Sequence, residues 1–103
     1  MSNTELEIIE RVEETIKVQI PKMWKVILHN DDTTTFDFVI AVLIRVFHKS
    51  MDEARELTQM IHMTGAGVAG VYTKEIAEEK TYETLMFAKA NGFPDMTASY
   101  EEM

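Results

Sequence analysis

The spacing of hydrophobic and polar positions changes several times along this chain, and each change predicts a new element. The apolar run over residues 23–28 suits a buried strand, because branched and aromatic side chains pack well on a pleated sheet. Apolar residues then recur every three or four positions over 36–47 and again over 54–61, which indicates two helices that each bury one face. The short link between these helices makes them antiparallel neighbours.

The second half of the chain repeats the change from strand to helix. We predict a short strand over 68–72, a helix from 74 to about 91 that Gly92 ends, and a final edge strand over 96–101. The order strand, helix, helix, strand, helix, strand predicts a single small α/β (α+β) domain, with the helices packed on a three-stranded sheet.

Capping residues mark the ends of the first two helices. Thr34 with Asp37, and Ser50 with Glu53, have the spacing of a capping box, in which each side chain bonds to a backbone N–H of the other residue. Gly65 suits the left-handed position that ends many helices.

The first 20 residues differ from the rest of the chain. They hold five glutamates against one arginine and one lysine, with scattered apolar residues. This composition predicts a flexible acidic arm over 1–20, ahead of a domain over 21–103. A short amphipathic helix and a docking strand are the alternatives for the arm.

Charge and composition narrow the class of protein. The net charge of −8 disfavours nucleic acid as a partner, because phosphates repel an acidic surface. The chain has no cysteine, no secretory signal and no apolar window long enough for a membrane span. We therefore expect a cytoplasmic monomer that binds neither nucleic acid nor membrane and holds no metal or other cofactor.

The first predicted strand stops at three consecutive polar residues, Asn30, Asp31 and Asp32. Such side chains turn the backbone by accepting hydrogen bonds from it, and the threonines that follow can cap a helix. A simple turn is the ordinary interpretation of this corner. A cation site and a general base are the alternatives.

His62 favours a binding site at this corner. It follows the inward-facing Ile61 near the end of the second helix, and antiparallel packing would bring that end back over Asn30 and Asp31. The resulting site would offer hydrogen-bond acceptors beside apolar side chains. A peptide amino terminus with a large hydrophobic first residue fits both parts. A metal is the weaker alternative, since the ligands have no recognised spacing, and a lone helical histidine is otherwise most often structural.

The chain lacks the common hydrolase, phosphate-binding and zinc-protease motifs, so we do not expect an enzyme. The charged residues at the start of the third helix have mixed signs. A solvated face is the ordinary interpretation of this patch, and a protein-docking face is the alternative.

Three separated blocks of sequence resemble the ClpS family, the bacterial N-end-rule adaptors that deliver substrates to the ClpA unfoldase of the ClpAP protease. The blocks are PKMWKVILHNDDTTTFDFVIAVL, IHMTGAGVAGVYTKEIAEEK and ANGFP. They agree with the family in order and spacing, over about residues 21–98. The resemblance implies a non-enzymatic adaptor that binds proteins beginning with Leu, Phe, Tyr or Trp.

The resemblance also implies roles for individual residues. Asn30, Asp31 and His62 match the positions that hold the α-amino group. Positions that shape the loop and the pocket are matched by Leu28, Asp32, Thr34, Phe36, Val39, Thr58 and Ile61. Glu75 and Lys80 match the face that meets the N-terminal domain of the chaperone, and the arm matches an extension needed for substrate delivery.

The chain departs from the family at five positions. Family members usually carry Met at Phe36 and Thr58, Pro at Thr35, an aliphatic residue at His29 and Leu at Asp95. Phe is bulkier and stiffer than Met at the pocket mouth, whereas Thr gives up apolar contact and leaves space. We expect binding of Leu and Phe to be retained.

Two other classes of protein remain as alternatives. The same order of elements resembles the C-terminal domain of the bacterial ribosomal stalk protein, a factor-docking module. Such domains are typically rich in Lys and Ala, and they lack an Asx corner facing a histidine. The other alternative is a small metal-dependent enzyme.

Overall fold

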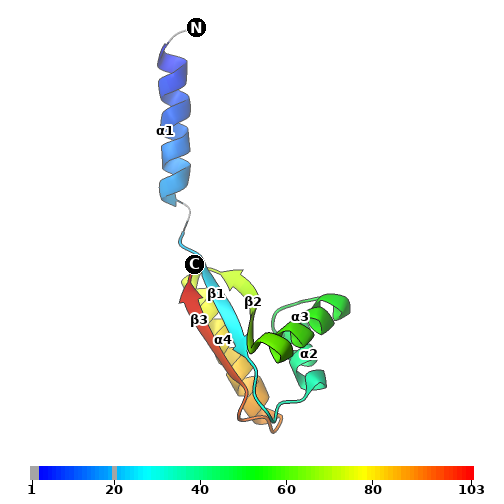
Figure 1. Ribbon diagram of the computed structural model, residues 1–103. Helices are drawn as coiled ribbons and strands as arrows, with labels where there is room; N and C mark the ends of the chain where they lie inside the picture. The colour runs from blue at the N-terminus through cyan, green and yellow to red at the C-terminus, as the bar shows by residue number, and fades with distance from the viewer. Residues whose placement is uncertain (1–2, 20) are drawn as a thin grey trace.

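The structure of the protein is a computed structural model that describes residues 3–19 and 21–103. Seven elements follow one another along the chain (Figure 1): α1 (Asn3–Gln19), β1 (Trp24–His29), α2 (Phe36–Arg45), α3 (Met51–Thr64), β2 (Ala66–Tyr72), α4 (Lys74–Ala90) and β3 (Thr97–Glu102). From β1 onward, the order of strands and helices is the predicted one. The first and last strands each begin and end one residue later than expected.

The three strands form one antiparallel sheet in the order β2-β1-β3. β1 lies in the centre, where Val26 pairs with Gly70 of β2 and with Tyr100 of β3. β3 forms an edge, as predicted. Because β1 is held on both sides, the sheet fixes the position of Asn30, the residue that follows it.

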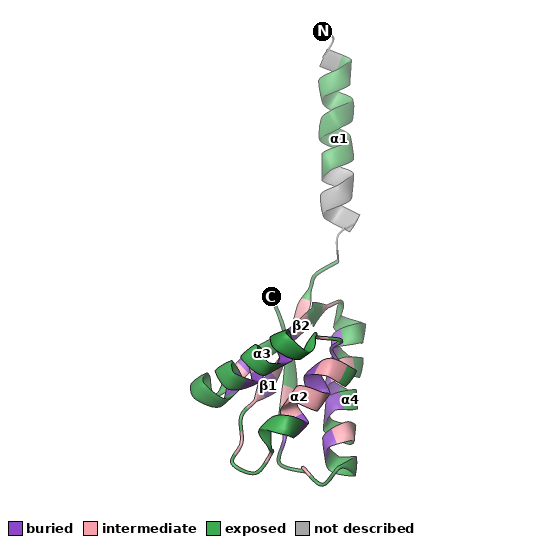
Figure 2. Ribbon diagram, turned by 90° about the vertical axis from the view of Figure 1, so that its right-hand side faces the viewer, coloured by how far each residue is buried: buried purple, intermediate pink, exposed green. Residues whose placement is uncertain are grey.

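The helices bury one face of this sheet. In β1, the side chains of Val26 and Leu28 are buried while their neighbours remain partly exposed, the alternation typical of a sheet covered on one side. Helical residues such as Leu43, Ile61 and Ala88 complete the core with them. Figure 2 shows buried residues where the helices meet the sheet. α2 and α3 are therefore held in fixed positions beside the end of β1.

The capping residues agree with the predictions at both ends of α3 but not at the start of α2. Ser50 and Glu53 form the expected capping box, and Gly65 ends α3 at φ 96°. The N-cap of α2 is Thr35 rather than Thr34, and the Thr35 hydroxyl accepts from the N–H of Phe38 at 3.2 Å. The prediction of Thr34 is wrong because its hydroxyl is bonded to the corner instead.

The acidic N-terminal segment is helical over Asn3–Gln19, which is one of the alternatives for the arm. Its apolar side chains Leu6, Ile8, Ile9 and Val12 are all exposed, and Figure 1 shows α1 standing away from the sheet. The flexibility of this arm stays a prediction. None of the described helices has the length and apolar character that a bilayer crossing requires.

Candidate functional site

Asp31 organises the polar corner after β1. Its Oδ1 accepts from the backbone N–H groups of Thr33 and Thr34 at 2.9 and 2.7 Å and from the Thr33 hydroxyl at 3.0 Å. Its Oδ2 accepts from the Thr34 hydroxyl at 2.7 Å. Burial raises the pKa of Asp31, but these hydrogen bonds outweigh burial and hold the pKa below its ordinary value. The carboxylate is therefore charged at neutral pH and the turn is rigid.

A backbone hydrogen bond joins this corner to the end of α3. The N–H of Asn30 donates to the carbonyl of Gly65 at 2.8 Å, so the residue that follows β1 is tied to the residue that ends α3. His62 lies three residues before Gly65. The bond thus brings the imidazole to the corner, as the antiparallel packing of the helices predicted.

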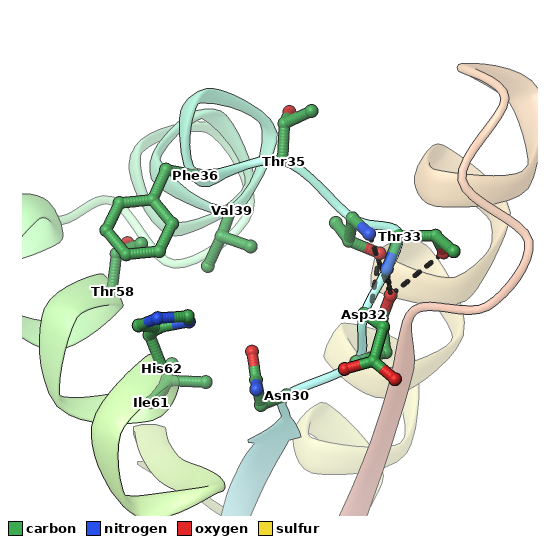
Figure 3. Close-up of a pocket in the computed structure, with 11 residues that line it drawn as sticks. Asn30, Asp32, Thr33, Thr35, Phe36, Val39, Thr58, Ile61 and His62 are labelled. Carbon is green, nitrogen blue, oxygen red and sulfur yellow. Dashed lines mark hydrogen bonds between the residues drawn. The ribbon is translucent and has the colours of Figure 1, made fainter.

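A cavity of about 470 Å³ lies between the corner and the two helices. Figure 3 shows the side chains of Asn30 and His62 pointing into it, one from the end of β1 and one from α3. The His62 ring also meets the ring of Phe36 edge to face, with the centroids 4.9 Å apart. The cavity is lined by Asn30, Asp31, Asp32, Thr33, Thr34, Thr35, Phe36, Val39, Thr58, Ile61 and His62.

All the residues predicted to hold the amino group or to shape the loop and pocket meet at this cavity, except Leu28. Leu28 is only 1% exposed, packs in the core and does not line the cavity. Two lining residues, Thr33 and Thr35, were not predicted. The run of three threonines was their only signal, and it did not show which of them faces the cavity.

The chemistry of the cavity differs between its two sides. The corner offers the side-chain oxygens of Asn30, Asp31 and Asp32, with the imidazole of His62 close by, and oxygen acceptors with negative charge suit an ammonium group. The side formed by Phe36, Val39 and Ile61 is apolar and suits a hydrophobic side chain. The site can hold both parts of one amphipathic ligand.

Asp95 lies outside the cavity but contacts the corner. Its Oδ2 accepts from the Thr33 hydroxyl at 2.9 Å. His29, another departure from the family pattern, faces the sheet instead, where its Nε2 lies 2.8 Å from the hydroxyl of Ser99 on β3. In the described part of the chain, no three or more acidic or histidine side chains lie close enough together to hold a metal ion.

Glu75 and Lys80 lie on α4, away from the cavity. The neighbour of Glu75, Lys74, places its ammonium 5.1 Å from the ring of Trp24, at the opposite end of β1 from the corner. The Lys80 ammonium donates to the carbonyl of Val46 at 2.8 Å and so holds the end of α2. Glu75 is exposed.

Comparison with known proteins gives one consistent family. Residues 19–97 match the family described as "ATP-dependent Clp protease adaptor protein ClpS". The adapter protein ClpS of Desulfatibacillum aliphaticivorans is 52% identical over 82 residues, which cover 80% of this chain and 79% of that protein. The adapter protein ClpS of Campylobacter jejuni is 45% identical over 89 residues, which cover 86% and 92% of the two chains.

A solved structure shows the same fold. It is Agrobacterium tumefaciens ClpS2 bound to L-phenylalaninamide, with a TM-score of 0.77 and 38% sequence identity. The match covers 82% of this chain and all of that one. Its ligand combines an α-amino group with a large apolar side chain.

Proposed function

Because this chain belongs to the ClpS family of ATP-dependent Clp protease adaptor proteins, we propose that its cavity binds the first residue of proteins marked for degradation. The chain is an adaptor and not an enzyme. The family match therefore argues against both alternative functions, the factor-docking module of the ribosomal stalk and the metal-dependent enzyme. One observation carries the proposal: the carboxylate of Asp31, the amide of Asn30 and the imidazole of His62 line the same cavity as an apolar wall.

In the proposed complex, the free α-amino group lies at the corner. Its N–H donors bond to the Asn30 side-chain oxygen and the His62 imidazole, and the Asp31 carboxylate neutralises its charge. Oδ1 of Asp31 already accepts from two backbone N–H groups and lies 3.0 Å from the Thr33 hydroxyl, whereas Oδ2 accepts a single hydrogen bond. Oδ2 is therefore the oxygen with room for the ligand, directly or through a water molecule.

The side chain of the first residue lies in the apolar part of the cavity. Phe36, Val39, Thr58 and Ile61 surround it, and Asp32 and Thr34 shape the mouth of the pocket. Leu and Phe fit such a wall by hydrophobic burial alone. A free amino group and a large first side chain together define the degron that we propose.

Delivery to the protease uses other parts of the chain. We assign residues 21–103 to the adaptor domain and residues 1–20 to a flexible arm that assists delivery. The partner is the N-terminal domain of the ClpA unfoldase, which docks on the face of α4 that carries Glu75 and Lys80. The adaptor acts as a monomer in the cytoplasm. The start of α4, where Lys74 contacts Trp24, lies at the opposite end of β1 from the corner, which supports docking while a substrate occupies the cavity.

The test measures binding of fluorescent peptides that differ only at the amino terminus. Peptides that begin with a free Leu or Phe should bind, and their acetylated forms should lose roughly 2 to 4 kcal/mol, because the corner acceptors remain unpaired. A peptide that begins with Glu should not bind. Equal affinity for the free and acetylated peptides would disprove recognition of the amino group.

A further inference from the structure

The hydroxyl of Thr58 is buried without a hydrogen-bond partner among the described residues. The side chain belongs to α3 and is 2% exposed. Buried hydroxyls nearly always have a partner, because an unpaired polar group loses its hydration without compensation. The position of Thr58 therefore needs an explanation.

Other threonines on the helices show how such a hydroxyl is usually satisfied. Thr64, Thr81 and Thr84 each donate to the backbone carbonyl four residues earlier, all at 2.8 Å. Thr58 makes no corresponding bond to the carbonyl of Ala54. Its hydroxyl is left available for a group that comes from outside the protein.

Thr58 lines the cavity on its apolar side. It lies one helical turn before His62 on the same face of α3, and it is 2% exposed whereas His62 is exposed, so the hydroxyl lies deeper in the cavity than the imidazole. Phe36 lines the same cavity, and its ring overlaps the Thr58 side chain in the view of Figure 3. The Phe36 side chain is 42% exposed, so it has room to turn outward when a ligand enters.

We infer that the Thr58 hydroxyl makes this adaptor prefer tyrosine as the first residue of its substrates. The inference rests on the proposed function, which places the amino group at the corner and the side chain along the wall. The phenol hydroxyl lies at the end of the ring farthest from the amino group, and it can both donate to and accept from a threonine hydroxyl. Leu and Phe have no polar atom there and leave Thr58 unpaired.

The test compares two peptides that are identical except for a first residue of Tyr or Phe. The protein should bind the Tyr peptide about three to ten times more tightly, the gain from one neutral hydrogen bond. Thr58→Val keeps the shape of the side chain and removes its hydroxyl, so it should reduce the ratio of the two affinities to about one. Thr58→Ser keeps the hydroxyl and should keep the preference.

Thr81→Val is the matched control. Thr81 is also a buried threonine on a helix, but its hydroxyl is paired with Ala77 and it does not line the cavity. The ratio of the two affinities should be unchanged in this variant. A loss of the Tyr preference in Thr81→Val as well would overturn the assignment to Thr58.

The outcomes separate this inference from the proposed function. If the Phe peptide binds and Thr58→Val leaves the ratio of affinities unchanged, the inference fails and the proposed function stands. If neither free-amino peptide binds, the proposed function fails and the inference fails with it.

The unfolding midpoint of the free protein gives a second measurement, since removing an unpaired buried hydroxyl should raise this midpoint. No rise in Thr58→Val would mean that the hydroxyl already has a partner, and would overturn the inference.

Discussion

The hydroxyl oxygen of Thr33 lies 2.9 Å from Oδ2 of Asp95, a residue 62 positions later in the chain. The contact joins the corner after β1 to the segment between α4 and β3. The same hydroxyl lies 3.0 Å from Oδ1 of Asp31, but it carries a single proton. One donor thus faces two carboxylates, and the corner holds two like charges close together.

Thr33→Val and Asp95→Asn separate the hydrogen bond from the charge. Thr33→Val removes the donor from both carboxylates and should lower the free energy of unfolding by about 1 kcal/mol. Asp95→Asn keeps an oxygen acceptor and removes one negative charge, so stability should be unchanged or slightly higher. Urea denaturation measures both effects. Equal losses in the two variants would show that the carboxylate charge of Asp95 stabilises the corner.

The lowered pKa of Asp31 predicts a loss of stability in acid. Because the hydrogen bonds favour the charged carboxylate, its pKa is lower in the folded protein than in the unfolded chain. The stabilisation is therefore present above the ordinary value of 3.8 and is lost as the pH falls through the folded-state pKa. Asp31→Asn should reduce this dependence without abolishing it, since hydrogen bonds from Ser50 also lower the pKa of Glu53. Denaturation curves over a series of acidic pH values provide the measurement, and an identical pH dependence in the variant would contradict the prediction.

His62→Ala should weaken peptide binding while the domain stays folded. The side chain is exposed at the cavity mouth, so its removal costs little packing, but the amino group loses a hydrogen-bond partner. We expect a loss of about 1 to 3 kcal/mol in binding free energy. Met63→Ala is the control, because Met63 is the next residue of α3, is 74% exposed and does not line the cavity. Similar affinities in the two variants would place the amino group elsewhere.

The order of elements in the domain could be predicted because each element carries its own periodicity. Val26 and Leu28 alternate with exposed neighbours, whereas residues such as Leu43 recur at helical spacing, and these patterns depend only on which face is buried. The proximity of His62 to the corner could also be predicted from the sequence, since two antiparallel helices with a short link have little freedom in their packing.

Details that depend on distances between atoms could not be predicted. Thr33, Thr34 and Thr35 are chemically alike, and only the geometry of the Asp31 turn shows that the third caps α2 while the other two bond to the carboxylate. The contact with Asp95 joins distant segments and leaves no local pattern. The unpaired hydroxyl of Thr58 could not be predicted either, because a buried helical threonine normally bonds to its own helix.

Glu75→Ala should reduce substrate delivery without changing peptide affinity. Glu75 is exposed in the first turn of α4 and lies far from the cavity, so its proposed role is confined to the chaperone. Lys80 is a less useful probe, because its bond to Val46 also holds α2. Glu83→Ala is the control, an exposed glutamate two turns further along α4. Degradation of a Phe-leading substrate by ClpAP should slow only in Glu75→Ala, and equal rates for the two variants would move the docking face elsewhere.

Gly67→Ala should damage the cavity through α3. A methyl group at Gly67 would lie 2.8 Å from both Cγ1 of Ile61 and Cε of Met60, which is too close for either contact. Met60 can turn away because it is exposed, but Ile61 is 3% exposed and lines the cavity, so it must shift. We expect a loss of about 1 to 3 kcal/mol in stability, together with weaker binding of free-amino peptides.

Gly70→Ala is the matched control on the same strand, since its methyl group would instead displace the side chain of Tyr72, which is not part of the cavity. It should lower stability and leave peptide affinity unchanged, and an equal loss of affinity in both variants would show that the effect is not transmitted through Ile61.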